Sequence, residues 1–158
     1  MLFTQTRIGK HGSPFTIYKF RTIPVGKTQP NVWGRFMRKT KLDELPQIIN
    51  IIKGEMTFVG PRPDIPGYAD ELKGEDRIIL TVKPGITGLA SLKYRKEEEL
   101  LNQQQHPQQF NDEVIWPDKV RINKWYVKNK SVGLDCVILF YTLVPIDFDV
   151  DKFLYKRY

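Results

Sequence analysis

The segment 60–67, GPRPDIPG, constrains the fold most strongly, because it holds three prolines and two glycines in eight residues. Proline lacks the backbone N–H that helices and sheets use, and it holds the residue before it in an extended conformation. Neither a helix nor a central strand can run through such a segment. The sequence therefore predicts a constrained loop here, with the regular elements before and after it.

The chain before this loop predicts a β-hairpin followed by helices. Residues 2–6 and 15–22 are rich in β-branched and aromatic residues, and the turn-forming cluster GKHGSP lies between them. After a loop at 24–30, Asn31 can cap a helix through VWGRFMRK. A second helix is expected at LDELPQIINIIKG, which Gly54 is placed to end. Its apolar residues fall on one helical face: Leu45, Ile48, Ile49 and Ile52.

The rest of the chain is expected to be mainly helical. Residues 57–59 can form a short strand, and 78–93 are typical of irregular β structure broken by proline and glycine. Helices are expected near 67–73, in the first half of 96–110, at 117–129 and at 134–144. The length fits one domain. The predicted fold class is α+β, a helix-rich single domain over residues 1–158 with an N-terminal β-hairpin and a small irregular sheet.

The charge composition narrows the classes of partner that the protein can bind. Lys and Arg number 25 and Asp and Glu 18, so the net charge of +7 favours nucleic acid, anionic headgroups or phosphorylated metabolites. No stretch reaches the roughly 20 apolar residues of a spanning helix, and no signal peptide opens the chain. These features predict a soluble or peripheral protein. Cys136 is the only cysteine, and its apolar neighbours predict a buried structural thiol. His11 and His106 lack metal-ligand partners and receive no role.

Asp43 and Glu44 form the first candidate for chemistry, and the residues alone allow two interpretations. Asp43 can be the N-cap of a helix whose first turn holds Pro46. Alternatively, helix-terminal N–H groups and nearby cations lower the pKa of the carboxylate and keep it anionic. An anionic carboxylate can bind Mg²⁺ or attack phosphorus as a nucleophile.

Basic residues and glycines supply candidate phosphate contacts. Arg62 is held between two prolines, which suits bidentate recognition of phosphate, although a surface arginine in a turn is the alternative. KPGITG, which contains Gly85, either lets backbone N–H groups approach a phosphate or forms a β-turn. Lys19 and Arg21 share one side of a strand and can extend the same anion site. A basic group also precedes Asp43: Arg35, Arg38, Lys39 and Lys41. A solvated basic face is the alternative for that group.

Five blocks in order, LFTQTRIG, FTIYKFRTI, GRFMRKTKLDELPQIINIIKGEMTFVGPRP, KPGITGLASL and WYVKNKSVGLDCVILFYTL, resemble the bacterial sugar transferase family. This family comprises the monotopic polyprenyl-phosphate phosphoglycosyl transferases. The resemblance implies that Asp43 attacks the sugar-bearing phosphate of a UDP-sugar, releases UMP and forms a phosphosugar–aspartyl intermediate. A polyprenyl phosphate then attacks that intermediate and yields a polyprenyl-diphosphate sugar.

The same resemblance implies roles for other residues. Glu44 is the second member of an acidic dyad, which helps accept the acceptor's proton or assists the metal. Mg²⁺ is the implied cofactor, with Asp43 as a ligand. The remaining implied site residues are Arg62 and Arg38 at phosphate, Arg95 after the KPGITG block, Asp135 in the last helix, and Pro61 and Gly85 in the two loops.

The resemblance also predicts a location. Family members normally carry an N-terminal hydrophobic helix that re-enters the membrane just before LFTQTRIG, and this chain begins with that block. We expect a peripheral protein at the cytoplasmic face of the bacterial inner membrane, or a soluble one if no anchor is supplied. Trp116, Trp125, Tyr126 and the terminal KFLYKRY are residue types that favour a lipid interface. The alternative is that the aromatic residues belong to the core and that the tail is frayed. Many members read Gln-Val-Asn-Gly-Arg where this chain reads Ser91-Leu92-Lys93-Tyr94-Arg95, so sugar preference does not carry over.

Two other functions compete with the transferase. The chain can be a catalytically silent remnant that only binds nucleotide sugars or a partner protein. It can also be a basic nucleic-acid-binding module, but it has no RNP pattern, zinc finger or helix-turn-helix signature. The sequence therefore predicts an enzyme that does not bind nucleic acid.

Overall fold

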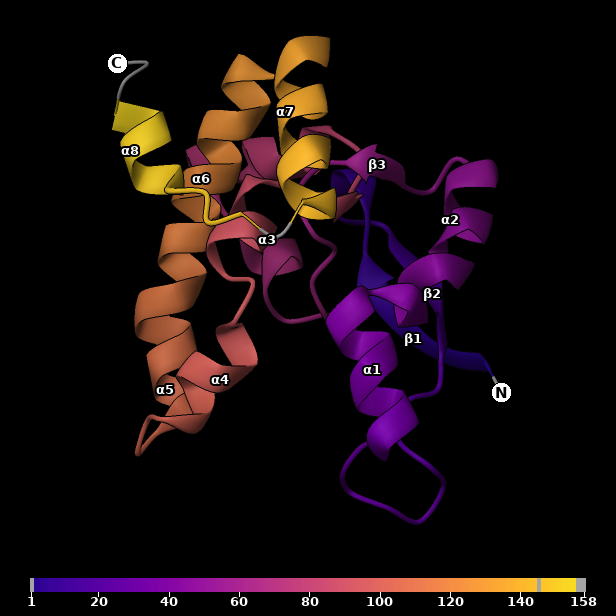
Figure 1. The fold of residues 1–158 in the computed structure, drawn as a ribbon. Coiled ribbons are helices and arrows are strands. Elements are labelled where there is room, and N and C mark those ends of the chain that lie inside the picture. Colours follow the sequence, from indigo (N-terminus) through magenta and orange to yellow (C-terminus); the bar gives the residue numbers. More distant parts are fainter. Residues whose placement is uncertain (1, 145, 156–158) are drawn as a thin grey trace.

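Short strands at the N-terminus and many helices after them make up the fold (Figure 1). The structure, a computed structural model, describes residues 2–144 and 146–155. Its strands form two separate two-stranded sheets, one antiparallel and one parallel. The predicted α+β class, with an N-terminal hairpin and a small sheet, is confirmed. That residues 1–158 form a single catalytic domain stays a prediction.

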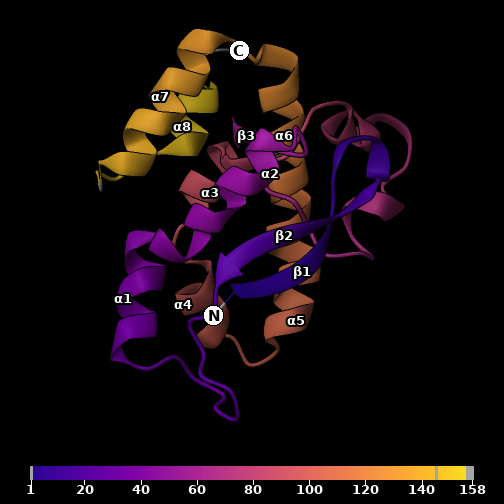
Figure 2. The ribbon, with the colours of Figure 1, turned by 90° about the vertical axis from the view of Figure 1, so that its right-hand side faces the viewer.

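The predicted hairpin is present. Strands β1 (Leu2–Ile8) and β2 (Pro14–Phe20) pair antiparallel with Leu2 opposite Phe20. The turn between them, η1 (Lys10–Gly12), is a 3-10 turn in which His11 (φ 61°) and Gly12 (φ 81°) are both left-handed. Glycine adopts that conformation without steric cost, which explains the turn-forming cluster. Figure 2 shows the hairpin from the side, and β2 packs against the segment that carries the acidic pair.

The next helix begins where the sequence predicts. Asn31 caps α1 (Val32–Thr40), and its Oδ1 accepts a hydrogen bond of 2.8 Å from the Gly34 N–H. Lys41, with φ 58°, ends this helix. The predicted second helix is divided into a 3-10 turn, η2 (Leu42–Gln47), and a short α2 (Ile48–Ile52). Pro46 lies inside η2, where its missing N–H and its ring oppose regular α-helix.

The segment after the proline-rich loop has less β structure than expected. Strand β3 (Thr57–Val59) pairs in parallel with β4 (Gly85–Thr87). The helix predicted near 67–73 is only a 3-10 turn, η3 (Ala69–Glu71). Within 78–93 the prediction was mostly wrong, because η4 (Gly74–Thr81) and α3 (Leu89–Lys93) occupy most of it. The apolar side chains of η4 and α3 are buried in the two core clusters. Packing against the core therefore overrides the local preference for extended backbone.

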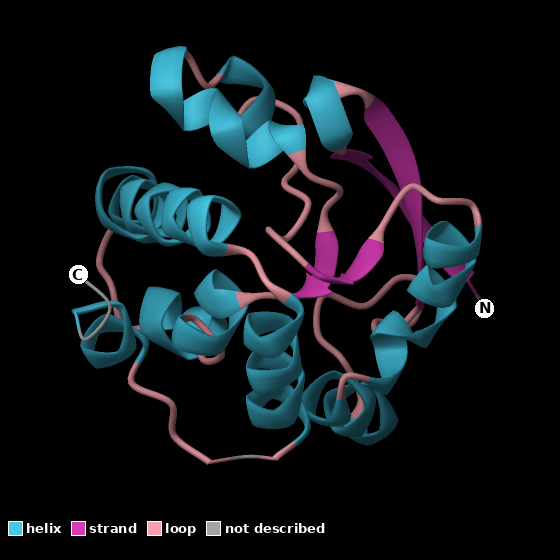
Figure 3. Cartoon of the chain, turned by 90° about the horizontal axis from the view of Figure 1, so that it is seen from above, coloured by secondary structure: helices cyan, strands magenta, loops and turns pink. Residues whose placement is uncertain are grey.

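The C-terminal half is helical and supplies most of the core. The elements are α4 (Glu97–Asn102), α5 (Pro107–Phe110), the π turn η5 (Asn111–Ile115), α6 (Trp116–Asn129), α7 (Val132–Leu143) and α8 (Val150–Tyr155). Ile122 and Tyr126 of α6 pack with Ile138 of α7 and Leu154 of α8. Figure 3 shows the small parallel sheet in the middle, with helices around it and the hairpin at one edge.

Burial overturns three expectations. Trp125 and Tyr126, predicted at a lipid interface, lie in the core at 6% and 1% exposure. Trp116 is half-buried against the ring of Tyr68. Cys136, predicted to be buried, is exposed. Residue types alone do not say which side of a helix faces the core. Residues 156–158 of the predicted basic tail lie outside the described residues. Of the helices described, none has the length and apolar content to cross a membrane.

Candidate active site

The acidic pair is turned inward by a tight connection. The left-handed Lys41 ends α1 and starts η2, so the helical path is interrupted just before the acidic pair. Asp43 and Glu44 are 9% and 5% exposed, and β2 packs against this turn. Asp43 is not an N-cap, because Lys41 occupies that position and no side-chain cap bond forms. Of the two interpretations from sequence, the structure therefore excludes the plain helix cap.

Glu44 is held between two cations. Its Oε1 lies 3.2 Å from the Lys19 Nζ and also accepts a hydrogen bond from Arg62, while its Oε2 accepts a second bond of 3.2 Å from the Arg62 Nη1. Burial alone would raise the pKa of Glu44, but Arg62 and Lys19 outweigh it and lower the pKa to about 2. Glu44 is therefore ionised at neutral pH and fixed in place. The phosphate-binding roles of Lys19 and Arg62 stay predictions, because in this structure both bind Glu44.

Asp43 has the opposite environment. Its Oδ1 is buried and has no hydrogen-bond partner among the described residues. Burial raises the pKa of Asp43, the neighbouring Glu44 raises it further, and Lys19 and Lys41 lower it only in part. The prediction of a lowered pKa was wrong, because desolvation exceeds the effect of the cations. Two adjacent carboxylates thus differ: Glu44 is fully engaged, while Asp43 keeps a free oxygen. Such a difference allows them different chemical roles.

The two proline- and glycine-containing motifs form one unit beside this pair. The Gly60 N–H donates to the Thr87 carbonyl and the Gly85 N–H donates to the Pro61 carbonyl, each at 2.9 Å. A Cβ atom added to Gly85 would lie 2.2 Å from the Gly60 nitrogen, so no larger residue fits without movement. Arg62 follows Pro61 directly at this junction. Its Nη1 donates to the Ile86 carbonyl at 3.4 Å and also to Glu44. Pro61 and Gly85 are therefore brought together as the support of Arg62.

Sequence reasoning missed Arg7 and Asp64, which lie next to this support. Arg7 of β1 donates 3.3 Å to the Pro63 carbonyl and 2.8 Å to the Gln5 side chain, while its Nε is buried without a partner. Burial and the charge of Arg62 lower the pKa of Arg7. Burial raises the pKa of Asp64 to about 6, although Lys119, Arg7 and Arg62 oppose the shift. The contact between Arg7 and Pro63 spans 56 positions, so no local pattern predicts it. The one local signal for Arg7 was that it lies on the same side of the first strand as Gln5.

Four further predicted residues contact other parts of the molecule. Arg38 donates to the Thr22 hydroxyl at 3.0 Å and pairs with Glu98 at 3.4 Å. Arg21 lies over the Phe3 ring, so it does not extend the Lys19 contact as expected. Arg95 donates to the Tyr141 carbonyl, and Asp135 accepts 2.7 Å from the Tyr126 hydroxyl. Within residues 2–144 and 146–155, no hydrogen bond or ion pair joins these four residues to Asp43 or Glu44, and their roles at substrate stay predictions.

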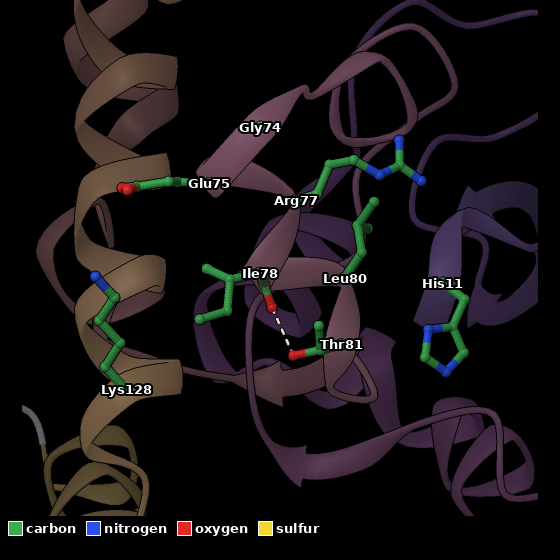
Figure 4. A pocket seen from close by; sticks show the side chains of 8 residues that line it. All are labelled: His11, Gly74, Glu75, Arg77, Ile78, Leu80, Thr81 and Lys128. Atoms are coloured by element: carbon green, nitrogen blue, oxygen red, sulfur yellow. Dashed lines mark hydrogen bonds between the residues drawn. The ribbon is translucent and has the colours of Figure 1, made fainter.

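The protein groups near Asp43 do not form a complete metal cage. Across residues 2–144 and 146–155, no three His, Cys, Asp or Glu side chains gather closely enough to hold a metal ion. A pocket of about 530 Å³ lies elsewhere, between the hairpin turn and η4 (Figure 4). His11 and Lys128 stand on its opposite sides, and the Thr81 hydroxyl already bonds to the Ile78 carbonyl. The acidic pair differs from this pocket in holding a buried carboxylate oxygen, the Oδ1 of Asp43, that has no partner among the described residues.

Comparison with known proteins places the chain in a family. The family model described as bacterial sugar transferase matches residues 1–147. An uncharacterized sugar transferase, EpsL, of Bacillus subtilis is 36% identical over 153 residues, which are 90% of this chain and 68% of the relative. The undecaprenyl-phosphate galactose phosphotransferase of Salmonella typhimurium is 32% identical over 168 residues, covering 89% of this chain and 32% of the relative.

A third relative extends the pattern. The UDP-glucose:undecaprenyl-phosphate glucose-1-phosphate transferase of Escherichia coli is 33% identical over 159 residues, covering 90% of this chain and 32% of the relative. The chain thus spans about two thirds of EpsL and about one third of the other two relatives. The match over nearly the whole chain shows that it belongs to the bacterial sugar transferase family.

Proposed function

We propose that this chain transfers a phosphosugar from a UDP-sugar to a polyprenyl phosphate, with Asp43 as the nucleophile. The observation that carries the proposal is the free, buried Oδ1 of Asp43 beside the cluster of Glu44, Arg62 and Lys19. A carboxylate oxygen without a hydrogen-bond partner is available to form a new bond. Relatives whose names describe sugar phosphotransfer to undecaprenyl phosphate support the reaction class.

The reaction proceeds in two steps. A carboxylate oxygen of Asp43 bonds to the sugar-bearing phosphorus of the UDP-sugar, and the bond from that phosphorus to the UMP oxygen breaks. UMP leaves and a phosphosugar–aspartyl intermediate remains. An oxygen of polyprenyl phosphate then bonds to the same phosphorus, the bond to Asp43 breaks, and polyprenyl-diphosphate sugar is released. Separating the steps lets a water-soluble donor and a lipid acceptor react in turn.

The neighbouring charges suit this chemistry. A diphosphate carries negative charge that cations must offset before an anionic nucleophile can approach. Arg62 and Lys19 bind Glu44, the residue that follows Asp43, and their charges also act on Asp43. Because Glu44 holds these cations in place, we assign it chiefly to their positioning. A carboxylate whose pKa is lowered to about 2 is a weak base, so we give proton acceptance from the acceptor a lesser part in its role.

The free oxygen of Asp43 also fits a Mg²⁺ ligand. Mg²⁺ prefers oxygen ligands and is commonly bound through one or two carboxylates together with substrate phosphates. Asp43 would supply such a carboxylate, whereas Glu44 is engaged by Arg62 and Lys19. When bound, the ion would neutralise the diphosphate and favour the ionised form of Asp43, whose pKa burial raises.

Release of UMP tests the proposal. The chain is mixed with UDP-sugars, Mg²⁺ and detergent-solubilised polyprenyl phosphate, and mass spectrometry follows the protein. We expect sustained UMP release and a phosphosugar adduct on wild type, both lost in Asp43→Asn. Wild type that binds UDP-sugar without releasing UMP would instead identify a catalytically silent remnant. Salt-dependent binding of RNA that UDP-sugar and Mg²⁺ leave unchanged would favour a nucleic-acid-binding module.

A lipid acceptor also requires work at a membrane surface. We propose that the chain acts as a peripheral protein at the cytoplasmic face of the inner membrane, because polyprenyl phosphate resides in the bilayer and UDP-sugars are water-soluble. Trp125 and Tyr126 cannot make this contact, because they are buried in the core. The contact surface must therefore lie in another part of the molecule.

A further inference from the structure

The segment that carries the acidic pair is inverted relative to an ordinary surface helix. Its polar side chains point inward, and its large apolar side chains point outward. The buried polar side chains are Asp43, Glu44, Gln47 and Asn50. The exposed apolar side chains are Leu42 (39%), Leu45 (49%), Ile48 (42%), Ile49 (42%) and Ile52 (81%). The apolar spacing that predicts an amphipathic helix is present, but the apolar face meets solvent.

The preceding helix adds to this surface. Val32 and Trp33 of α1 are 76% and 71% exposed, Phe36 is 48% exposed, and the rings of Trp33 and Phe36 lie 5.5 Å apart. Eight of the nineteen large apolar side chains that are exposed in the described chain fall within residues 32–52. Such a concentration within 21 consecutive residues is more typical of a segment that binds a partner than of apolar residues scattered singly over a surface. We call residues 32–52 the apolar segment.

The charges around the apolar segment select its partner. The charged side chains exposed between positions 31 and 53 are all positive: Arg35, Lys39, Lys41 and Lys53. The only acidic residues there, Asp43 and Glu44, are buried. Apolar side chains with a basic surround are the composition that binds the headgroup region of anionic bilayers. A symmetric pairing of two copies through this face would instead bring like charges together.

We propose that the apolar segment docks into the surface of an anionic lipid bilayer. This inference rests on the proposed function, since it places Asp43, which belongs to the same segment, at the level where a lipid phosphate lies. Figure 1 places α2 at one edge of the molecule and α8 at the opposite edge, and Figure 2 shows α1 at the left of the view and α2 nearer its middle. The same turn thus presents Ile48, Ile49 and Ile52 outward and holds the dyad behind them.

Vesicle co-sedimentation of the 158-residue chain tests the docking. The vesicles are phosphatidylcholine alone, or phosphatidylcholine with about one third phosphatidylglycerol. We expect binding to the anionic vesicles, weakened by high salt. Ile49→Glu/Ile52→Glu should bind at least about tenfold less tightly, because carboxylates replace inserted apolar groups. Tyr155→Glu is the matched control: Tyr155 is 83% exposed on α8, and its substitution should leave binding unchanged.

The basic residues give a second, graded readout. Lys39→Gln should weaken binding to anionic vesicles about fivefold and leave binding to neutral ones unchanged. Circular dichroism checks that every variant is folded. Failure of wild type to bind anionic vesicles overturns the docking, as does equal loss of binding in Tyr155→Glu and in the isoleucine variant. A dimer in sedimentation velocity that the isoleucine variant dissolves, with no vesicle binding, would assign the face to a second copy.

A separate assay distinguishes this inference from the proposed function. The donor half-reaction, UMP release and adduct formation without any lipid, needs no membrane contact. Vesicle binding without UMP release supports the docking and contradicts the catalytic proposal. UMP release without vesicle binding does the reverse. Asp43→Asn should bind vesicles like wild type, and Ile49→Glu/Ile52→Glu should still release UMP from the donor.

Discussion

Helix α6 and the apolar segment bury opposite kinds of side chain. Helix α6 buries Ile122, Trp125 and Tyr126 against α3, α7 and α8, and it exposes Arg121 and Lys128. The apolar segment buries carboxylates and amides and exposes isoleucine and leucine. The first arrangement lowers the free energy of the fold in water. The second arrangement raises that free energy. It is consistent with the two roles we propose, a reactive carboxylate on the buried side and a bound partner on the exposed side.

The comparison separates stability from activity within one small protein. Apolar contacts among the C-terminal helices carry stability, while the turn at Asp43 holds a desolvated carboxylate that an ordinary core would exclude. Functional sites commonly depart from the patterns that stabilise a fold. Four tests, which use five substitutions, probe this separation, beginning with the largest expected effect.

Asp43→Asn should break the activity and spare the fold. We expect UMP release to fall by about 10³-fold or more, because the nucleophile is removed. The midpoint of urea unfolding at pH 7 should stay the same or rise, since the amide does not carry the charge that burial disfavours. Asp112→Asn, on the solvent-exposed side of η5, is the control and should keep full activity. Activity retained in Asp43→Asn would remove this residue from the mechanism.

A pair of isoleucine substitutions compares the two regions directly. Ile122→Ala in α6 removes a side chain with 0% exposure, and we expect a loss of about 2–5 kcal/mol in the free energy of unfolding. Ile52→Ala removes the same atoms at 81% exposure and should change that free energy by no more than about 0.5 kcal/mol. Chemical denaturation of both variants measures the difference. Equal losses would show that the apolar segment is buried in solution and would undermine the contrast.

Glu44→Gln should reveal how much the ion pairs of the buried turn contribute to the stability of the fold. Arg62 and Lys19 contact Glu44, and the charges of Asp43 and Lys41 also act nearby. The folded pKa of about 2 lies below the model-peptide value of 4.5, so the ionised form stabilises the fold above about pH 4.5. That stabilisation, on the order of 2 kcal/mol, is lost as the pH falls towards 2.

The measurement for Glu44 is urea unfolding at neutral and acidic pH. Wild type should lose more stability on acidification than Glu44→Gln does. At pH 7 the variant should already be less stable than wild type. Glu113→Gln, an exposed carboxylate on η5, serves as control and should follow wild type. Parallel pH curves for wild type and Glu44→Gln would mean that Glu44 keeps its ordinary pKa.

Asp64→Asn should have a smaller effect than Glu44→Gln, with the opposite sign. Burial raises the pKa of Asp64 to about 6, against the opposing charges of Lys119, Arg7 and Arg62 and with support from Glu97. The folded state therefore holds the proton more tightly than the unfolded state, and its stabilisation is complete below about pH 4 and lost above about pH 6. At pH 8 the variant should be more stable than wild type by about 1 kcal/mol, and at pH 4 the two should be alike. Equal differences at both pH values would contradict the shifted pKa.

Local sequence signals predicted much of the fold. Asn31 caps α1 because its side chain needs only the Gly34 N–H three residues later. GKHGSP forms the hairpin turn because glycine and a short loop suffice. The acidic pair and the arginine between prolines were also found, since their residue types are unusual in their local settings. Each of these features depends on neighbours within a few positions.

Other parts of the site depended on contacts between distant positions. Lys19 reaches Glu44 across 25 positions and Arg7 reaches Pro63 across 56. Arg21 contacts Phe3, and Arg38 contacts Thr22 and Glu98. The sequence did not predict these contacts, and the roles of both arginines at substrate stay predictions. No pattern within a single segment contains this information.

The sequence by itself determined where the hairpin and the helix capped by Asn31 lie, which residues could do chemistry, and that Leu45, Ile48, Ile49 and Ile52 share a face. Only the tertiary structure decided that this face points outward and that Trp125 and Tyr126 point inward. The physical reason is that periodicity gives the angle between side chains around a helix axis, whereas the direction of the core depends on which elements pack against that helix.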